Sequence, residues 1–187
     1  MTRSIALTAL ATSLLLAACS REPAGDGNGQ DASVTAVDAN KTPPRDWNAV
    51  DACGGVDKAA MAAVVGQQVT ETRLGNVHES DGTTSATSEC TYVLADGGTA
   101  TLMLRWSPIA DNNEGSINAA RSALEQTLKG FGGKLETVDS LGKAAFWAGM
   151  TKSLNVFIAE DKFAIITMPP SANAKDQAVA LARKLGA

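Results

Sequence analysis

Apolar and polar residues alternate along residues 99–106 more regularly than anywhere else in the chain. The apolar face consists of Ala100, Leu102, Leu104 and Trp106. The opposite face holds threonines, Met103 and Arg105. The same alternation runs through residues 90–95, and Asp96-Gly97-Gly98 separates the two segments. Because glycine tolerates the positive φ of tight turns, this pattern predicts an antiparallel hairpin.

A helical period replaces the alternation further along the chain. Its apolar residues recur at spacings of three and four, at Ile117, Ala120, Leu124, Leu128 and Phe131. This spacing predicts an amphipathic helix with Ser116 as its N-cap. Glycines at 130, 132 and 133 are placed to end it.

The other segments carry weaker patterns. Residues 57–65 predict a helix capped by Asp57 and ended by Gly66, and residues 172–185 predict a C-terminal helix. A second hairpin is predicted from two apolar runs that meet at Asp161. These runs cover 153–160 and 162–168, and further strands are expected at 68–77, at 135–138 and around Phe146-Trp147.

The predicted elements follow the order helix, strands, helix, strands, helix. Strands joined by hairpins form antiparallel sheets, and the intervening helices must cover a face of the sheet. We therefore predict an α+β fold, with an antiparallel sheet of about five to seven strands and helices packed mainly on one face. Two αβββ-like halves should be followed by a C-terminal helix.

The first residues have the composition of an export signal. Arg3 precedes an apolar run from Ile5 to Ala18, which is shorter than the roughly 20 residues of a membrane-spanning helix. The run closes on Leu16-Ala17-Ala18-Cys19, which resembles the lipobox of bacterial lipoproteins. The resemblance implies that residues 1–18 are removed and that Cys19 is acylated, so that the bilayer is a partner. The alternative is an ordinary secretory peptide cut near Ala18.

Residues 19–50 have the composition of a flexible tether. Small, polar and helix-breaking residues dominate there, and Trp47 is the one aromatic, expected to pack on the domain edge. A single α+β domain is expected over residues 51–187. Bacterial lipoproteins without aspartate directly after the acylated cysteine are commonly sent to the outer membrane, and residue 20 is serine. The resemblance therefore implies an outer-membrane location facing the periplasm.

The remaining two cysteines predict a disulfide. With Cys19 acylated, Cys53 and Cys90 form an even pair, and an oxidising compartment favours their bridge. The alternative, a metal or redox site, lacks a CxxC motif and further soft ligands. The spacing Cys53…Cys90-x-Tyr92 and the stretch from Leu141 to Trp147 resemble small domains of unknown function in secreted lipoproteins. That resemblance implies a fold and a location, and it supplies no catalytic residues.

The chain offers few groups for catalysis or ligand binding. Its one histidine lies in His78-Glu79-Ser80-Asp81, where the readings are a metal site or a solvated loop, and the loop is favoured. Asp111-Asn112-Asn113-Glu114 lacks the regular alternation of a calcium loop, and no serine has a supporting histidine motif. We expect no catalytic residues, metal or cofactor. A formal net charge of −4 argues against nucleic acid as a partner.

Two classes of function fit this sequence. We favour a non-enzymatic envelope lipoprotein that binds a protein or a small ligand, or that organises the envelope. The alternative is a periplasmic enzyme or metal-binding protein with a site built from scattered carboxylates. Met103, Arg105 and Phe157 face away from the main apolar rows and form a candidate partner surface. The competing interpretation is a second small core, covered by the first helix or by the segment near Trp47. The other aromatics, Trp106, Phe146 and Trp147, are expected to be core or to line a pocket.

Overall fold

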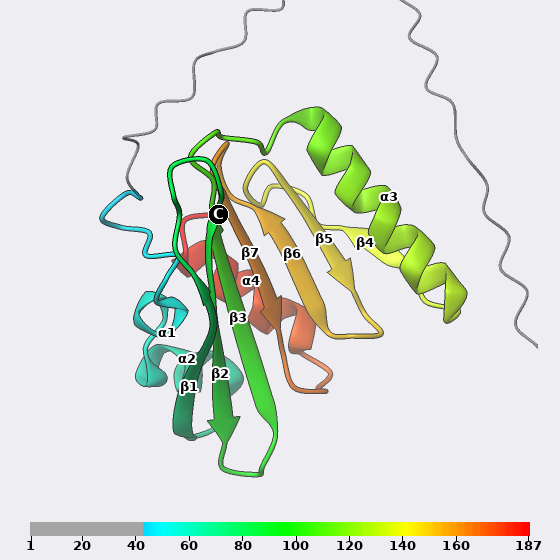
Figure 1. The fold of residues 1–187 in the computed structure, drawn as a ribbon. Helices are drawn as coiled ribbons and strands as arrows, with labels where there is room; N and C mark the ends of the chain where they lie inside the picture. The colour runs from blue at the N-terminus through cyan, green and yellow to red at the C-terminus, as the bar shows by residue number, and fades with distance from the viewer. Residues whose placement is uncertain (1–42) are drawn as a thin grey trace, which may run out of the picture. The chain divides into compact units, whose positions relative to one another are not determined.

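A computed structural model describes residues 43–187, and it confirms the α+β class. The predicted signal peptide, Cys19 and most of the tether lie outside these residues. Within the described part, seven strands form one antiparallel sheet in the order β1-β2-β3-β7-β6-β5-β4 (Figure 1). The strands are β1 (Val69–His78), β2 (Ala86–Leu94), β3 (Thr99–Trp106), β4 (Leu135–Thr137), β5 (Ala144–Ala148), β6 (Ser153–Phe157) and β7 (Lys162–Thr167). The two halves meet where β3 pairs with β7.

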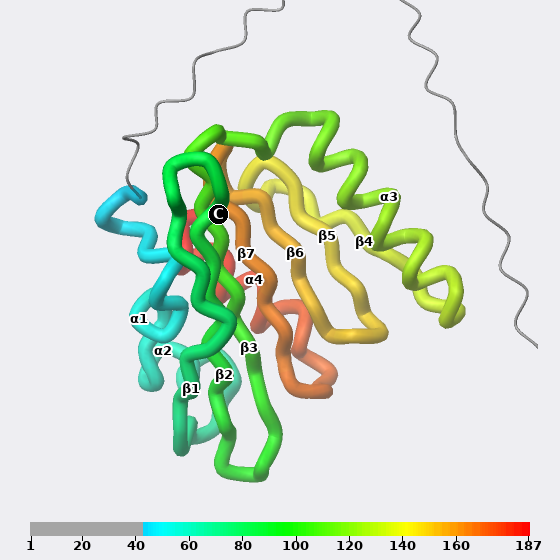
Figure 2. The backbone as a smooth tube through the Cα atoms, viewed as in Figure 1, coloured from blue at the N-terminus to red at the C-terminus, as the bar shows by residue number. Residues whose placement is uncertain are grey.

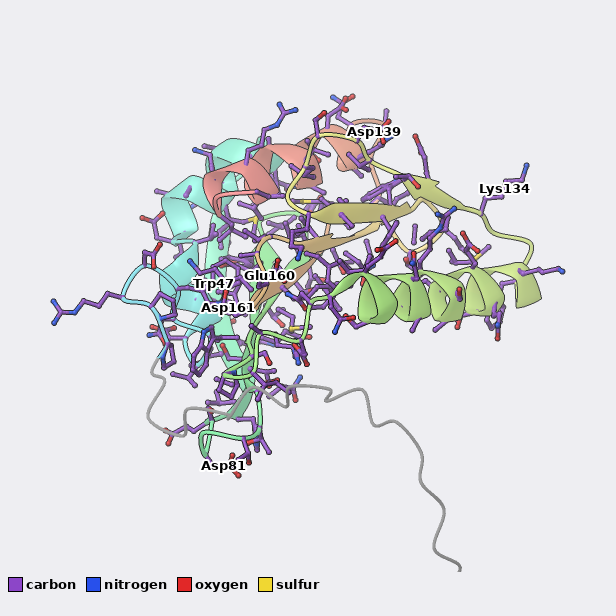
Figure 3. All side chains as sticks on the ribbon, turned by 90° about the horizontal axis from the view of Figure 1, so that it is seen from above. Trp47, Asp81, Lys134, Asp139, Glu160 and Asp161 are labelled. Carbon is purple, nitrogen blue, oxygen red and sulfur yellow. A yellow bond between two sulfur atoms is a disulfide. The ribbon has the colours of Figure 1, made fainter. Side chains whose placement is uncertain are left out.

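The helices lie on both faces of this sheet, three on one face and one on the other. They are α1 (Ala52–Gly55), α2 (Lys58–Val65), α3 (Glu114–Gly130) and α4 (Ala174–Lys184). Helices α1, α2 and α4 share the main core with the sheet. Helix α3 lies on the opposite side from α4 (Figure 3). Figure 2 shows the chain leaving β3 and passing to α3 on the β4–β5 side of the sheet.

The main core confirms the alternation read from the sequence. Every apolar residue predicted for one face of β3 is at most 1% exposed. The facing residues of β2, β6 and β7 join them, together with Met61 of α2 and Leu181 of α4. The core therefore explains why β3 occupies its predicted bounds: its alternate side chains exchange water for apolar neighbours.

Helix capping follows the prediction in α2 and differs from it in α3. The Asp57 carboxylate accepts a hydrogen bond from the backbone N–H of Ala60 at 2.7 Å, and Gly66 ends the helix with φ 76°. In α3 the N-cap is Asn113, whose side chain accepts from the backbone N–H of Ser116 at 3.0 Å. Ser116 is already inside the helix, and its hydroxyl donates back to the Asp111 carbonyl at 2.6 Å.

The predicted disulfide joins Cys53 to Cys90. It fastens α1 to β2, and the Cys90 side chain is fully buried in the main core. Two hydrogen bonds reinforce the same junction. The backbone N–H of Ala52 donates to the Ser88 hydroxyl at 2.9 Å, and the Tyr92 hydroxyl donates to the Val56 carbonyl at 2.6 Å.

The packed domain begins before residue 51, where the sequence placed its start. Trp47 is 2% exposed and Ala49 is fully buried. The Trp47 indole N–H donates to the Arg105 carbonyl at 3.1 Å, and the Lys162 ammonium lies 5.7 Å from the centroid of its ring. Burial of one large aromatic therefore offsets the entropy of ordering a short polar segment.

Candidate functional site

The sheet face opposite α1, α2 and α4, called the outer face below, carries cross-strand rows of side chains. One row runs across β2, β3, β7, β6 and β5, and it is mixed in character. Its members are Glu89, Met103, Ile165, Asn155 and Phe146. A flanking row consists of Thr91, Thr101, Thr167, Ser153 and Ala148. A half-polar surface of this kind differs from the other face, whose rows are almost entirely apolar.

Helix α3 covers only the β4–β5 end of the outer face. There Ile117 packs with Phe146 and Phe157 in a second, smaller core. The Phe157 ring lies 6.3 Å from that of Phe146 and 4.7 Å from that of Phe163, measured between centroids. Phe157 is 6% exposed, so its predicted place on an open surface is wrong. The competing interpretation, a second small core, is correct for Phe157. The element that covers this core is α3, and not the first helix or the segment near Trp47.

The other two residues of the predicted surface lie on the outer face beyond α3. Met103 and Arg105 are half-buried in β3. The Arg105 guanidinium makes two hydrogen bonds to the Asp111 carboxylate, at 3.0 and 2.5 Å. Burial acts to raise the pKa of Asp111, but several contributions, led by the hydrogen bonds from Arg105, together outweigh it and hold that pKa below its usual value. Arg105 is therefore held in place by the loop before α3.

A cleft of about 250 Å³ opens between α3 and the neighbouring outer face. Its walls combine aliphatic side chains with four short polar ones. They are Leu124, Thr127, Leu128, Ala148, Thr151, Ser153, Asn155 and Ile165. The volume lies slightly below the range of about 300–1,000 Å³ that is common for small-molecule sites.

Three of the four polar side chains in the cleft already have partners. The Thr127 and Thr151 hydroxyls donate to backbone carbonyls within their own segments, and the Ser153 and Thr167 hydroxyls lie 3.0 Å apart. Asn155 differs from them. It is 7% exposed, and its amide has no hydrogen-bond partner among residues 43–187. Among the described residues, the cleft therefore contains one largely buried asparagine whose amide opens onto the cleft without a partner from the fold.

The two acidic loops singled out in the sequence serve the fold. The Asp81 carboxylate accepts hydrogen bonds from the backbone N–H groups of Thr84 and Thr83 and from both hydroxyls, and together these lower its pKa. Figure 3 shows Asp81 at the tip of the β1–β2 hairpin. Asn112 is 2% exposed, and its amide donates to the carbonyls of Ala159 and Lys162. Across the described residues, no three His, Cys, Asp or Glu side chains gather as metal ligands would.

The tryptophans belong to the core. Trp106 is fully buried, and its indole N–H donates to the Asp161 carboxylate at 3.0 Å. Trp147 is 6% exposed and packs in the main core, while Phe146 lies under α3. These aromatics therefore stabilise the two cores, and the cleft walls are aliphatic.

No protein-family model, curated protein or solved structure matches the sequence or the fold. Among residues 43–187, no helix has the length and apolar character needed to cross a bilayer.

Proposed function

We propose that this chain is a lipid-anchored binding protein of the cell envelope, held at the outer membrane through an acylated Cys19. The lipobox-like stretch before Cys19 supports the anchor. The Cys53–Cys90 bridge supports an oxidising compartment, because structural disulfides persist outside the reducing cytoplasm. In the reducing cytoplasm these two cysteines would remain thiols, and the bridge would not stabilise the fold.

The observation that carries the binding role is the partial cover of the outer face. Helix α3 protects the β4–β5 end, whereas Met103 and Ile165 sit side by side on adjacent strands beyond it, both half-buried. Apolar groups framed by threonines suit contact with a ligand or partner. A non-enzymatic role is proposed because, among residues 43–187, three of the four polar side chains that line the cleft are engaged in hydrogen bonds of the fold.

The anchor is tested by metabolic labelling with radioactive palmitate and by membrane fractionation. Cys19→Ser should abolish labelling and release the protein from membranes, while the neighbouring control Ser20→Ala should behave as the wild type does. Ser20→Asp should retain the labelled protein at the inner membrane. A Cys19→Ser chain that still sediments with membranes after a salt wash would refute the proposed anchor.

A further inference from the structure

The cleft under α3 contains a polar group that the fold leaves without a partner. Asn155 sits in β6 between Leu154 and Val156, which point into the main core. Its cross-strand neighbours on the outer face are Phe146 and Ile165, and neither side chain can bond an amide. The amide atoms are not sealed off by the fold and open onto the cleft, so whatever occupies the cleft is what can bond them.

The opposite wall of the cleft makes no hydrogen bond to this amide in the described structure. Helix α3 presents Leu124 and Leu128 there, and the Thr127 hydroxyl already donates to the Ala123 carbonyl at 2.9 Å. A leucine at position 155 would fill similar space, whereas the asparagine gives the cleft both a donor and an acceptor. The presence of asparagine at this position therefore points to a partner that enters the cleft.

The lining restricts the chemistry of that partner. Among residues 43–187, no Asp, Glu, Lys, Arg or His lines the cleft, so these residues offer nothing there to pair with an ionised group. An asparagine side chain both donates and accepts, and therefore suits a carbonyl, a carboxamide or a hydroxyl group. The aliphatic residues around it suit a hydrocarbon body.

We propose that this cleft binds a small uncharged molecule with an aliphatic body and one carbonyl, carboxamide or hydroxyl group. The body packs between Leu124, Leu128 and Ile165, and the polar group bonds to the Asn155 amide. This inference deepens the binding role proposed above and depends on it, but it is independent of acylation at Cys19.

The outer face provides room for a longer ligand than the cleft alone holds. Ile165 lines the cleft and is the cross-strand neighbour of Met103, so an aliphatic chain leaving the cleft passes onto a half-buried apolar surface. The threonines of the adjacent row border this path without adding charge. A flexible methionine is well suited to chains of varying shape.

The inference is tested by NMR titration of the ¹⁵N-labelled full-length chain carrying Cys19→Ser, with octanamide as the probe. Octanamide should shift the backbone signals of the second half of α3 and of β6, together with the side-chain NH₂ signals of Asn155, in a saturable way. Octanoate, its charged counterpart, should bind more weakly. Shifts absent at the solubility limit of octanamide, or centred elsewhere, would overturn the inference.

The decisive variant is Asn155→Leu, with Asn118→Leu on the exposed side of α3 as the matched control. Asn155→Leu should weaken octanamide binding roughly three- to tenfold, the effect of losing one hydrogen bond. It should leave the melting temperature unchanged or higher, because the amide makes no hydrogen bond within the described fold and a leucine buries more apolar surface. Asn118→Leu should change neither the affinity nor the shifted residues.

Two results would contradict the role of Asn155. Undiminished octanamide affinity in Asn155→Leu would mean that solvent, and not a ligand, satisfies the amide. A lower melting temperature in Asn155→Leu would mean that the amide supports the fold. Either result leaves the anchor test at Cys19 unaffected, so failure of the cleft and failure of the anchor are distinguishable.

Discussion

Reduction of the Cys53–Cys90 bridge should cost the domain a large part of its stability. The bridge spans a sequence separation of 37 residues. For a loop of that length, the chain-entropy model gives a destabilisation of about 4 kcal/mol when the crosslink is removed from the unfolded chain. Small domains are typically stable by only about 5–15 kcal/mol, so this change moves the unfolding midpoint far toward lower urea.

Reduction of the disulfide removes the crosslink without removing any side-chain atom from the core. Reduction leaves both sulfur atoms in place, whereas Cys90→Ala would also open a cavity, because Cys90 is fully buried. The Cys19→Ser chain retains only the two cysteines of interest, since the sequence has three. Comparison of its oxidised and reduced forms therefore measures the bridge alone.

Urea unfolding followed by tryptophan fluorescence is a direct assay. The three tryptophans of the chain are each at most 6% exposed, so unfolding transfers all of them to water. The oxidised form should be more stable by about 3–4 kcal/mol. The reduced form should show a larger m-value, because its unfolded chain is more expanded. A difference below about 1 kcal/mol, with the bridge verified by mass spectrometry, would refute the entropic reasoning.

Three further predictions concern single side chains. Tyr92 is the sole tyrosine, and burial raises the pKa of its hydroxyl. Its phenolate absorbance should therefore appear together with unfolding. The contribution of Tyr92 to stability should be constant below a pH of about 10 and fall above it by up to about 1.4 kcal/mol per pH unit, because the unfolded state ionises first. A phenolate titrating near pH 10 in folded protein would contradict this. Phe157→Ala should cost about 3–5 kcal/mol in urea unfolding and Met103→Ala only about 1 kcal/mol, whereas equal losses would place both in a core. Asn112→Ala should cost about 1–3 kcal/mol by the same assay, since the Ala159 carbonyl loses its donor and the Lys162 carbonyl loses one of several.

The sequence predicts an element well where a single physical effect dominates. In β3 the alternation is complete because one face is buried and the other is not, and the observed bounds match. Gly66 ends α2 because its backbone adopts positive φ. By contrast, α1 was missed: its short ACGG segment has poor helix propensity, and it is held by the Asp51 cap and the bridge to β2.

The candidate site was harder to predict, because it depends on which face α3 covers. The pattern places Phe157 opposite Leu154 and Val156, but periodicity does not indicate whether a later helix crosses to that side. The loop before α3 leads the chain to the outer face. It is fixed there by the hydrogen bonds of Asn112 and by the bond between Arg105 and Asp111. One signal for the cleft was present in the sequence: an asparagine in the middle of an apolar strand.

The bridge also determines how the domain would respond to mechanical load. Under the proposed anchor, a pull from the membrane enters the fold at Trp47 and reaches Cys53 a few residues later. The disulfide then passes the load directly to Cys90 in β2, which lies between β1 and β3 within the sheet. Helix α2 and strand β1 lie in the bridged loop and carry none of this tension. Under the proposed anchor, tension on the tether would therefore not unfold α2 and β1 before the disulfide transmits the force to the sheet.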